Sequence, residues 1–151
     1  MTQDLKRLKV AAVFLALIMA VVLAPNVYAA DIEVEMLNRR DDGAKMVYSD
    51  DIVRIDVGDT ITWVPTTKGH NVHFLVGPDG WDIPKKSKQN KEVVLTFEVP
   101  GVYLYQCTPH ATMGMIGFVV VGDDTSNLDA IKKAKVRGKS KKLFKKLIKE
   151  L

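Results

Sequence analysis

Apolar and polar residues alternate along much of the chain from Ile32 onward. The apolar members of this alternation fall into five runs: Ile32-Val34-Met36, Val53-Ile55-Val57, Ile61-Trp63, Val93-Leu95-Phe97 and Ile116-Phe118-Val120. A period of two is typical of a strand that buries one face. Turn-forming residues separate the runs, as at Gly58-Asp59 and Pro100-Gly101. Several short strands with such breaks predict an all-β sandwich.

After Gly122 the period changes to that of a helix. Ser126 and Asp129 resemble a capping box, and Gly138 fits a helix stop. A second helix is predicted from Ser140, with lysines around one apolar stripe made of Leu143, Phe144, Leu147, Ile148 and Leu151. A basic amphipathic helix of this kind can pack on the sandwich or lie on an anionic membrane.

The first residues have the pattern of a secretory signal peptide. Lys6, Arg7 and Lys9 precede an apolar run over residues 10–24, and small residues follow at 27–29. The run is shorter than the roughly 20 residues of a spanning helix. We therefore expect a signal peptide at 1–29, a sandwich domain at 30–122 and a helical tail at 123–151. An uncleaved N-terminal anchor is the alternative.

Charge is divided unevenly between the sandwich domain and the tail. Residues 30–122 carry nine basic and 13 acidic side chains, whereas residues 123–151 carry ten basic and four acidic ones. An exported chain with an acidic central domain is not expected to bind nucleic acid. At 151 residues the chain is too short for a two-domain dehydrogenase. Its single cysteine, Cys107, excludes an internal disulfide and every metal site that needs several cysteines.

The candidate chemistry lies at the end of the domain. Cys107, His110 and Met115 are spaced as Cys-x2-His-x4-Met, and Gly69-His70-Asn71 supplies a second histidine. A free thiol in an exported protein oxidises readily, and a role as metal ligand removes that hazard. Two imidazoles, one thiolate and a weak axial thioether form the blue-copper arrangement.

Two positions in this set have competitors. Met113 is spaced almost as well as Met115 for the axial place, and His73 competes with His70. We prefer His70 because Gly69 permits a sharp turn before it and because Asn71 can hydrogen-bond across to the opposite loop.

In these residues the chain resembles the pseudoazurins, which are small periplasmic cupredoxins. The resemblance rests on EVEMLN at 33–38, KGHNV at 68–72, CTPH at 107–110, MGMI at 113–116 and VVVGD at 119–123. It implies a Greek-key cupredoxin sandwich with two C-terminal helices packed on it, which makes membrane association unexpected. It also implies one type 1 copper with the ligands His70, Cys107, His110 and Met115, and Asn71 bridging toward the cysteine sulfur.

The resemblance further implies a monomeric one-electron shuttle rather than an enzyme. His110 would be the exposed ligand, and the partner surface around it would include Lys68, Pro109 and Met113, with candidate lysines at 85, 86, 88 and 91. The expected partners are a donor such as a c-type cytochrome and an acceptor such as copper nitrite reductase. A copper-delivery protein is the main alternative. A thiol enzyme is a weaker one, because no third residue orients Cys107 and His110.

Overall fold

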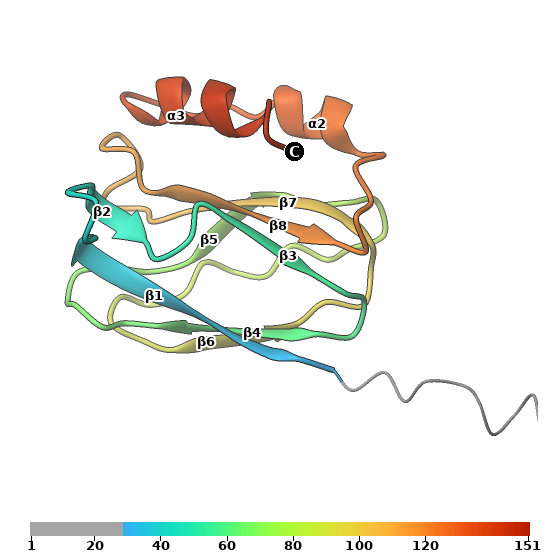
Figure 1. Cartoon of the computed structure of the whole chain (residues 1–151), viewed down its shortest axis with the longest axis horizontal. Coiled ribbons are helices and arrows are strands. Elements are labelled where there is room, and N and C mark those ends of the chain that lie inside the picture. Colours follow the sequence, from blue (N-terminus) through green and yellow to red (C-terminus); the bar gives the residue numbers. More distant parts are fainter. Residues whose placement is uncertain (1–28) are drawn as a thin grey trace, which may run out of the picture.

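The computed structural model describes residues 29–151, so nearly all of the predicted signal peptide lies outside the described part. Two four-stranded sheets face each other as a sandwich (Figure 1). The first sheet contains, in spatial order, β2 (Lys45–Tyr48), β1 (Asp31–Arg39), β4 (Thr60–Val64) and β6 (Val93–Thr96). The second contains β3 (Ile52–Ile55), β8 (Ile116–Val121), β7 (Gly101–Gln106) and β5 (His73–Val76). The predicted all-β Greek-key sandwich is confirmed.

The strand pairing determines where the candidate ligands lie. β1 pairs in parallel with β4, and β3 in parallel with β8, so the chain crosses between the sheets rather than running as a simple meander. β7 and β8 form an antiparallel hairpin in register from Gly101↔Val121 to Gln106↔Ile116. The loop 107–115 joins these two strands, so the hairpin fixes both of its ends.

The space between the sheets is filled by aromatic side chains, which we call the sandwich core. Trp63 is fully buried and makes edge contacts with Phe74 and Tyr105, at ring-centroid distances of 5.6 and 5.3 Å. Edge-to-face packing is a favoured aromatic geometry. Cys107 and Met115 belong to the same buried cluster.

A second apolar layer, the helix-side core, lies on the outer face of the β3-β8-β7-β5 sheet. The two predicted C-terminal helices, α2 (Leu128–Lys132) and α3 (Ser140–Leu147), cover this face (Figure 1). Phe144 and Leu147 are buried there, and the Phe144 ring lies 5.8 Å from that of Phe118. The apolar stripe of α3 therefore packs on the sheet, and its lysines point away from it.

The run Ile116-Phe118-Val120 departs from the prediction of a half-buried strand. These residues belong to the helix-side core, whereas the intervening Val119 and Val121 belong to the sandwich core. β8 is thus buried on both faces, because a helix layer covers the face that a two-sheet sandwich alone would leave to solvent.

The start of α2 also differs from the prediction. Asn127, not Ser126, is the N-cap, and no side chain caps the helix. Instead, the Asn127 side chain bonds both backbone groups of Val102: Oδ1 accepts from its N–H and Nδ2 donates to its carbonyl, each at 2.8 Å. This amide ties the tail to β7. α2 ends at Lys132, well before Gly138. Within residues 29–151, no helix is long and apolar enough to cross a membrane.

Candidate metal centre

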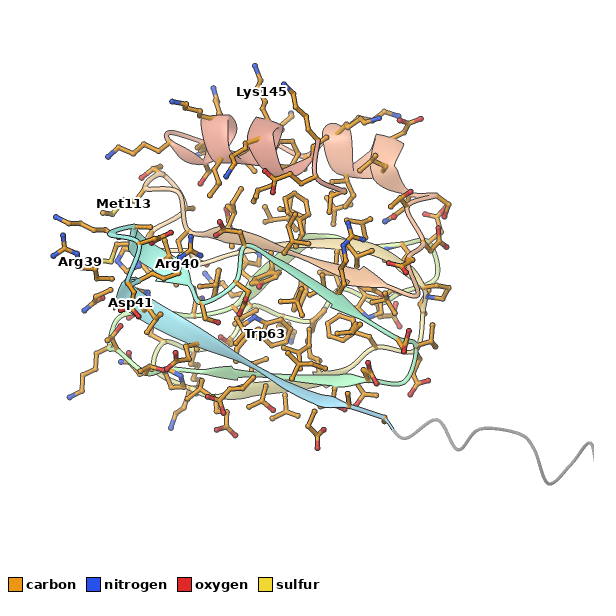
Figure 2. All side chains as sticks on the ribbon, in the orientation of Figure 1. Arg39, Arg40, Asp41, Trp63, Met113 and Lys145 are labelled. Carbon is orange, nitrogen blue, oxygen red and sulfur yellow. The ribbon has the colours of Figure 1, made fainter. Side chains whose placement is uncertain are left out.

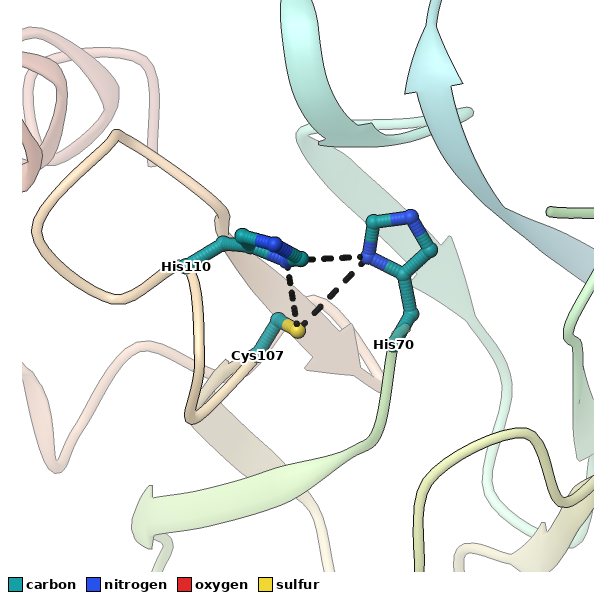
Figure 3. A group of neighbouring side chains, drawn as sticks. All are labelled: His70, Cys107 and His110. Carbon is teal, nitrogen blue, oxygen red and sulfur yellow. Dashed lines mark hydrogen bonds between the residues drawn. The ribbon is translucent and has the colours of Figure 1, made fainter. Parts of the chain in front are cut away.

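Two histidines and the single cysteine converge at one end of the sandwich (Figure 3). The Cys107 Sγ lies 3.4 Å from the His110 Nδ1 and 3.7 Å from the His70 Nδ1. The two Nδ1 atoms are 3.2 Å apart. Residues from two loops, 37 and 40 positions apart in sequence, thus present three donor atoms to one point.

His70 is oriented by a hydrogen bond of its ring and by one from the N–H of the preceding glycine. Gly69 has φ of +100°, a conformation that favours glycine, and its N–H donates to the Asn90 Oδ1 at 2.6 Å. The His70 Nε2 lies 2.9 Å from the Asn38 Oδ1. Because an amide oxygen can only accept, Nε2 carries the proton and Nδ1 is left with a free lone pair facing Cys107. His70 itself is fully buried.

Cys107 follows β7 directly and is held by its backbone. Its N–H donates to the Met115 carbonyl at 3.0 Å, and its carbonyl accepts from the His110 N–H at 3.1 Å. Burial raises the pKa of the thiol, and the backbone N–H groups of Asn71 and His110 oppose this shift by favouring the thiolate. A catalytic cysteine needs the opposite, a lowered pKa and a base. The environment therefore favours a sulfur that is stabilised by a bound cation over a free nucleophile.

Both imidazoles are kept neutral by burial. Burial, with a smaller contribution from the charge of His110, lowers the pKa of His70 to about 4. Burial also lowers the pKa of His110, which is partly exposed. Neutral imidazoles can donate lone pairs to a metal. His73, the competitor of His70, lies outside this group, with its Nδ1 3.5 Å from the Thr108 Oγ1.

The two methionines of the loop have opposite environments. Met115 is fully buried in the cluster that holds Cys107, and its N–H lies 3.4 Å from the His110 carbonyl. The side chain of Met113 is 45% exposed. Burial in the same cluster as the thiol favours Met115 for the axial place, and exposure favours a surface role for Met113.

Asn71 joins the two loops that carry the donor atoms. Its Oδ1 accepts from the Thr108 N–H at 2.8 Å, and its Nδ2 donates to the Ser87 carbonyl at 3.0 Å. The bond to the opposite loop agrees with the sequence-based expectation. Asn38, Ser87 and Asn90 also hold this region and were not expected. No local pattern marks them, because each acts across 16 to 32 residues of sequence.

The donor set fits copper. Imidazole nitrogen and thiolate sulfur suit both copper oxidation states, and the three side chains bring one thiol and two neutral rings together with no carboxylate among them. A hard, oxygen-preferring cation such as Mg²⁺ or Ca²⁺ would find no oxygen ligand in this group.

The chain is similar in sequence to a known copper-binding family. The model of the copper-binding plastocyanin/azurin family matches residues 34–122. A pseudoazurin of Paracoccus pantotrophus is 46% identical over 121 residues, which are 79% of this chain and 82% of that protein. The chain belongs to the pseudoazurins.

The pseudoazurin fold extends through the C-terminal helices. The native pseudoazurin structure of Hyphomicrobium denitrificans superimposes with a TM-score of 0.74 at 40% identity, covering 81% of this chain and 98% of that one. A pseudoazurin of Methylorubrum extorquens is 42% identical over 125 residues, or 80% of this chain and 83% of that protein. The protein is therefore a blue-copper electron-transfer protein of the cupredoxin type, and copper is its cofactor.

Proposed function

We propose that the chain is a periplasmic one-electron shuttle whose single type 1 copper is held by His70, Cys107, His110 and Met115. The convergence of the Cys107 Sγ with the Nδ1 atoms of His70 and His110 carries the proposal. The bound copper supplies the redox chemistry by alternating between Cu(II) and Cu(I).

The contribution of the protein is to keep the proposed metal-ligand side chains in a fixed geometry. His70 is fixed through Asn38, the Cys107 backbone through Met115 and His110, and the two loops through Asn71. A ligand set that cannot rearrange keeps the same geometry in both oxidation states, and this speeds electron exchange. Burial of the sulfur and of His70 also excludes water from the site.

Electrons would enter and leave through His110. It is the one member of the three-residue group that is partly exposed, since His70 and Cys107 are buried. Pro109, Met113 and Lys68 are exposed and would contribute to the partner surface. We expect a donor such as a c-type cytochrome and an acceptor such as copper nitrite reductase. The predicted signal peptide at 1–29 supports a periplasmic location.

Absorption and EPR spectra of the mature protein with Cu(II), before and after ascorbate, test this function. We expect intense visible absorption from thiolate-to-copper charge transfer, narrow copper hyperfine splitting and reversible bleaching. A pale protein with wide splitting would contradict ligation by Cys107 and would favour copper delivery without electron transfer.

A pair of variants tests the axial ligand. Met115→Leu should keep a coloured site but raise its reduction potential, because a weak electron donor is lost. Met113→Leu is the matched control and should leave the potential unchanged. The reverse pattern would show that the axial assignment is wrong.

A further inference from the structure

The residue before β1 is hydrogen-bonded to the turn between β3 and β4. The Ala30 N–H donates to the Asp59 Oδ1 at 2.6 Å, and the Ala30 carbonyl accepts from the Thr60 N–H at 2.9 Å. β1 begins at the next residue and pairs with β4 from Asp31↔Thr60 onward. Ala30 is therefore the point at which the first strand is attached to the sandwich.

Asp59 is a buried carboxylate without a cationic side chain beside it. The residue is 6% exposed, and its other oxygen, Oδ2, accepts from the Asp56 N–H at 2.9 Å. Among residues 29–151, no lysine, arginine or histidine nitrogen lies within 4.0 Å of either oxygen. Burial of a carboxylate is costly unless hydrogen bonds and a positive charge compensate it. Two backbone N–H groups bond this carboxylate, and neither carries a full charge.

The predicted signal peptide ends at the peptide bond that precedes this contact. Hydrolysis of the bond between Ala29 and Ala30 consumes one water molecule, leaves a carboxylate on Ala29 and frees the Ala30 nitrogen as an α-amino group. Such a group is protonated below about pH 7. The nitrogen that donates to Asp59 as a neutral amide in the uncut chain would then donate as an ammonium. A charge-assisted hydrogen bond is roughly twice as strong as a neutral one.

We propose that cleavage after Ala29 creates an ion pair between the α-ammonium of Ala30 and the carboxylate of Asp59. The pair exists only in the mature protein and attaches β1 more firmly to the β3–β4 turn. The inference rests on the predicted signal peptide at 1–29 and not on the copper site. Figure 2 shows Met113, in the loop 107–115, at the opposite end of the molecule from the start of β1.

Acetylation of the α-amino group tests the ion pair, because it removes the charge and keeps one N–H donor on Ala30. Mass spectrometry of the exported protein should first show Ala30 as the N-terminal residue, and another N-terminus would overturn the proposal. The Cu(II)-loaded protein is then compared, by thermal unfolding at about pH 6, with the form acetylated by an N-terminal acetyltransferase. We expect acetylation to lower the Tm by about 3–6 °C. The effect is modest because Ala30 is exposed and water screens part of the pair.

Two substitutions in the β3–β4 turn show whether Asp59 is the partner of the ammonium. In Asp59→Asn, acetylation should change the Tm by less than about 1 °C, because the negative charge is gone. Asp56→Asn is the matched control, since it removes the same charge from an exposed side chain of the same turn, and acetylation should keep its full effect there. An equal effect of acetylation in the wild type and in Asp59→Asn, or no effect in the wild type, would overturn the proposal.

A chain that is one residue longer decides the question if Asp59→Asn does not fold. A protein that begins at Ala29 keeps an α-ammonium but moves it one residue, up to about 3.8 Å, away from its place beside Asp59. Its Tm should fall as far as that of the acetylated protein. A Tm equal to that of the mature protein would mean that the position of the ammonium has no effect, and would overturn the ion pair. A colourless Cu(II) wild type would overturn the proposed shuttle function and not the ion pair.

Discussion

The sandwich core and the helix-side core are built from the same kinds of side chain but have different relations to the candidate metal centre. The sandwich core contains Cys107 and Met115 among its buried members, whereas the helix-side core contains no proposed ligand. Burial around the sulfur thus has two effects, because the same contacts stabilise the fold and exclude water from the site. Burial under α3 stabilises the fold only.

The two cores nevertheless meet at the loop 107–115. The Ser140 hydroxyl donates to the Ala111 carbonyl at 2.6 Å, and the Lys139 N–H donates to the Thr112 carbonyl at 2.8 Å. The first turn of α3 therefore rests on the loop that carries His110. We therefore expect most substitutions in the helix-side core to change the stability of the fold alone. Substitutions where α3 contacts the loop should change both the stability and the copper spectrum.

The largest effect is expected at the sulfur itself. Cys107→Ser should abolish the intense visible absorption, because that band is a thiolate-to-copper transition and a serine hydroxyl is not a thiolate. Thr112→Ser, an exposed change in the same loop, is the control and should keep the band. Titration with Cu(II) followed by absorption measures the effect. A blue Cys107→Ser protein would contradict the assignment of the sandwich-core sulfur as a ligand.

The next largest effect is expected in the helix-side core. Phe144→Ala should lower the free energy of unfolding by about 3–5 kcal/mol, because it removes a buried ring that packs on Phe118. Lys145→Ala, on the exposed side of the same helix, should change it by less than about 0.5 kcal/mol. Denaturant unfolding of the two variants gives both values.

The copper spectrum of folded Phe144→Ala decides whether the two cores are independent. We expect an unchanged blue band, since Phe144 touches no proposed ligand. A shifted band would mean that packing strain from the helix side reaches the metal centre.

A smaller loss of unfolding free energy is expected at Asn71, whose side-chain amide joins the two loops. Asn71→Ala leaves the Thr108 N–H and the Ser87 carbonyl without their partner. Because Thr108 is exposed and Ser87 is half-buried, solvent replaces part of both bonds, and we expect a total loss of about 2–3 kcal/mol in the free energy of unfolding. The visible band should also shift, because the loops lose their tie. Asn90→Gly, which removes one bond from an exposed residue and keeps its positive φ of 59°, is the control and should have a weaker effect on both readouts.

Local patterns in the sequence predicted the parts of the fold that depend on local geometry. Alternation identified β1, β3, β4, β6 and β8, and the spacing of Cys107, His110 and Met115 placed three candidates on one loop. Alternation could not show that β8 is buried on both faces, because a period of two indicates which residues share a face and not what covers that face. Val57 continued one apolar run and is nevertheless 47% exposed, since β3 ends at Ile55.

Apart from the bond of Asn71 to the opposite loop, the hydrogen bonds that distant residues supply were not predictable from local patterns in the sequence. Asn38 is 32 residues from His70 yet fixes its tautomer, and nothing in the first strand distinguishes it from a surface amide. The spacing predicted Ser126 as the N-cap of α2. Asn127 occupies the N-cap position instead, and its side chain is hydrogen-bonded to the backbone of Val102 in β7. In the second case a tertiary contact overrides a local preference.

The smallest effect is expected at the junction of the two cores, and it tests their coupling most directly. Ser140 is fully buried, so Ser140→Ala leaves the Ala111 carbonyl without its donor and should cost about 1–3 kcal/mol of unfolding free energy. Because Ala111 adjoins His110, the variant should also shift the visible band and broaden the copper EPR signal slightly. Ser126→Ala, at an exposed serine of the same tail, is the matched control and should leave both spectra unchanged. A loss of stability with an unaltered spectrum would mean that the tail supports the sheet but does not position the loop.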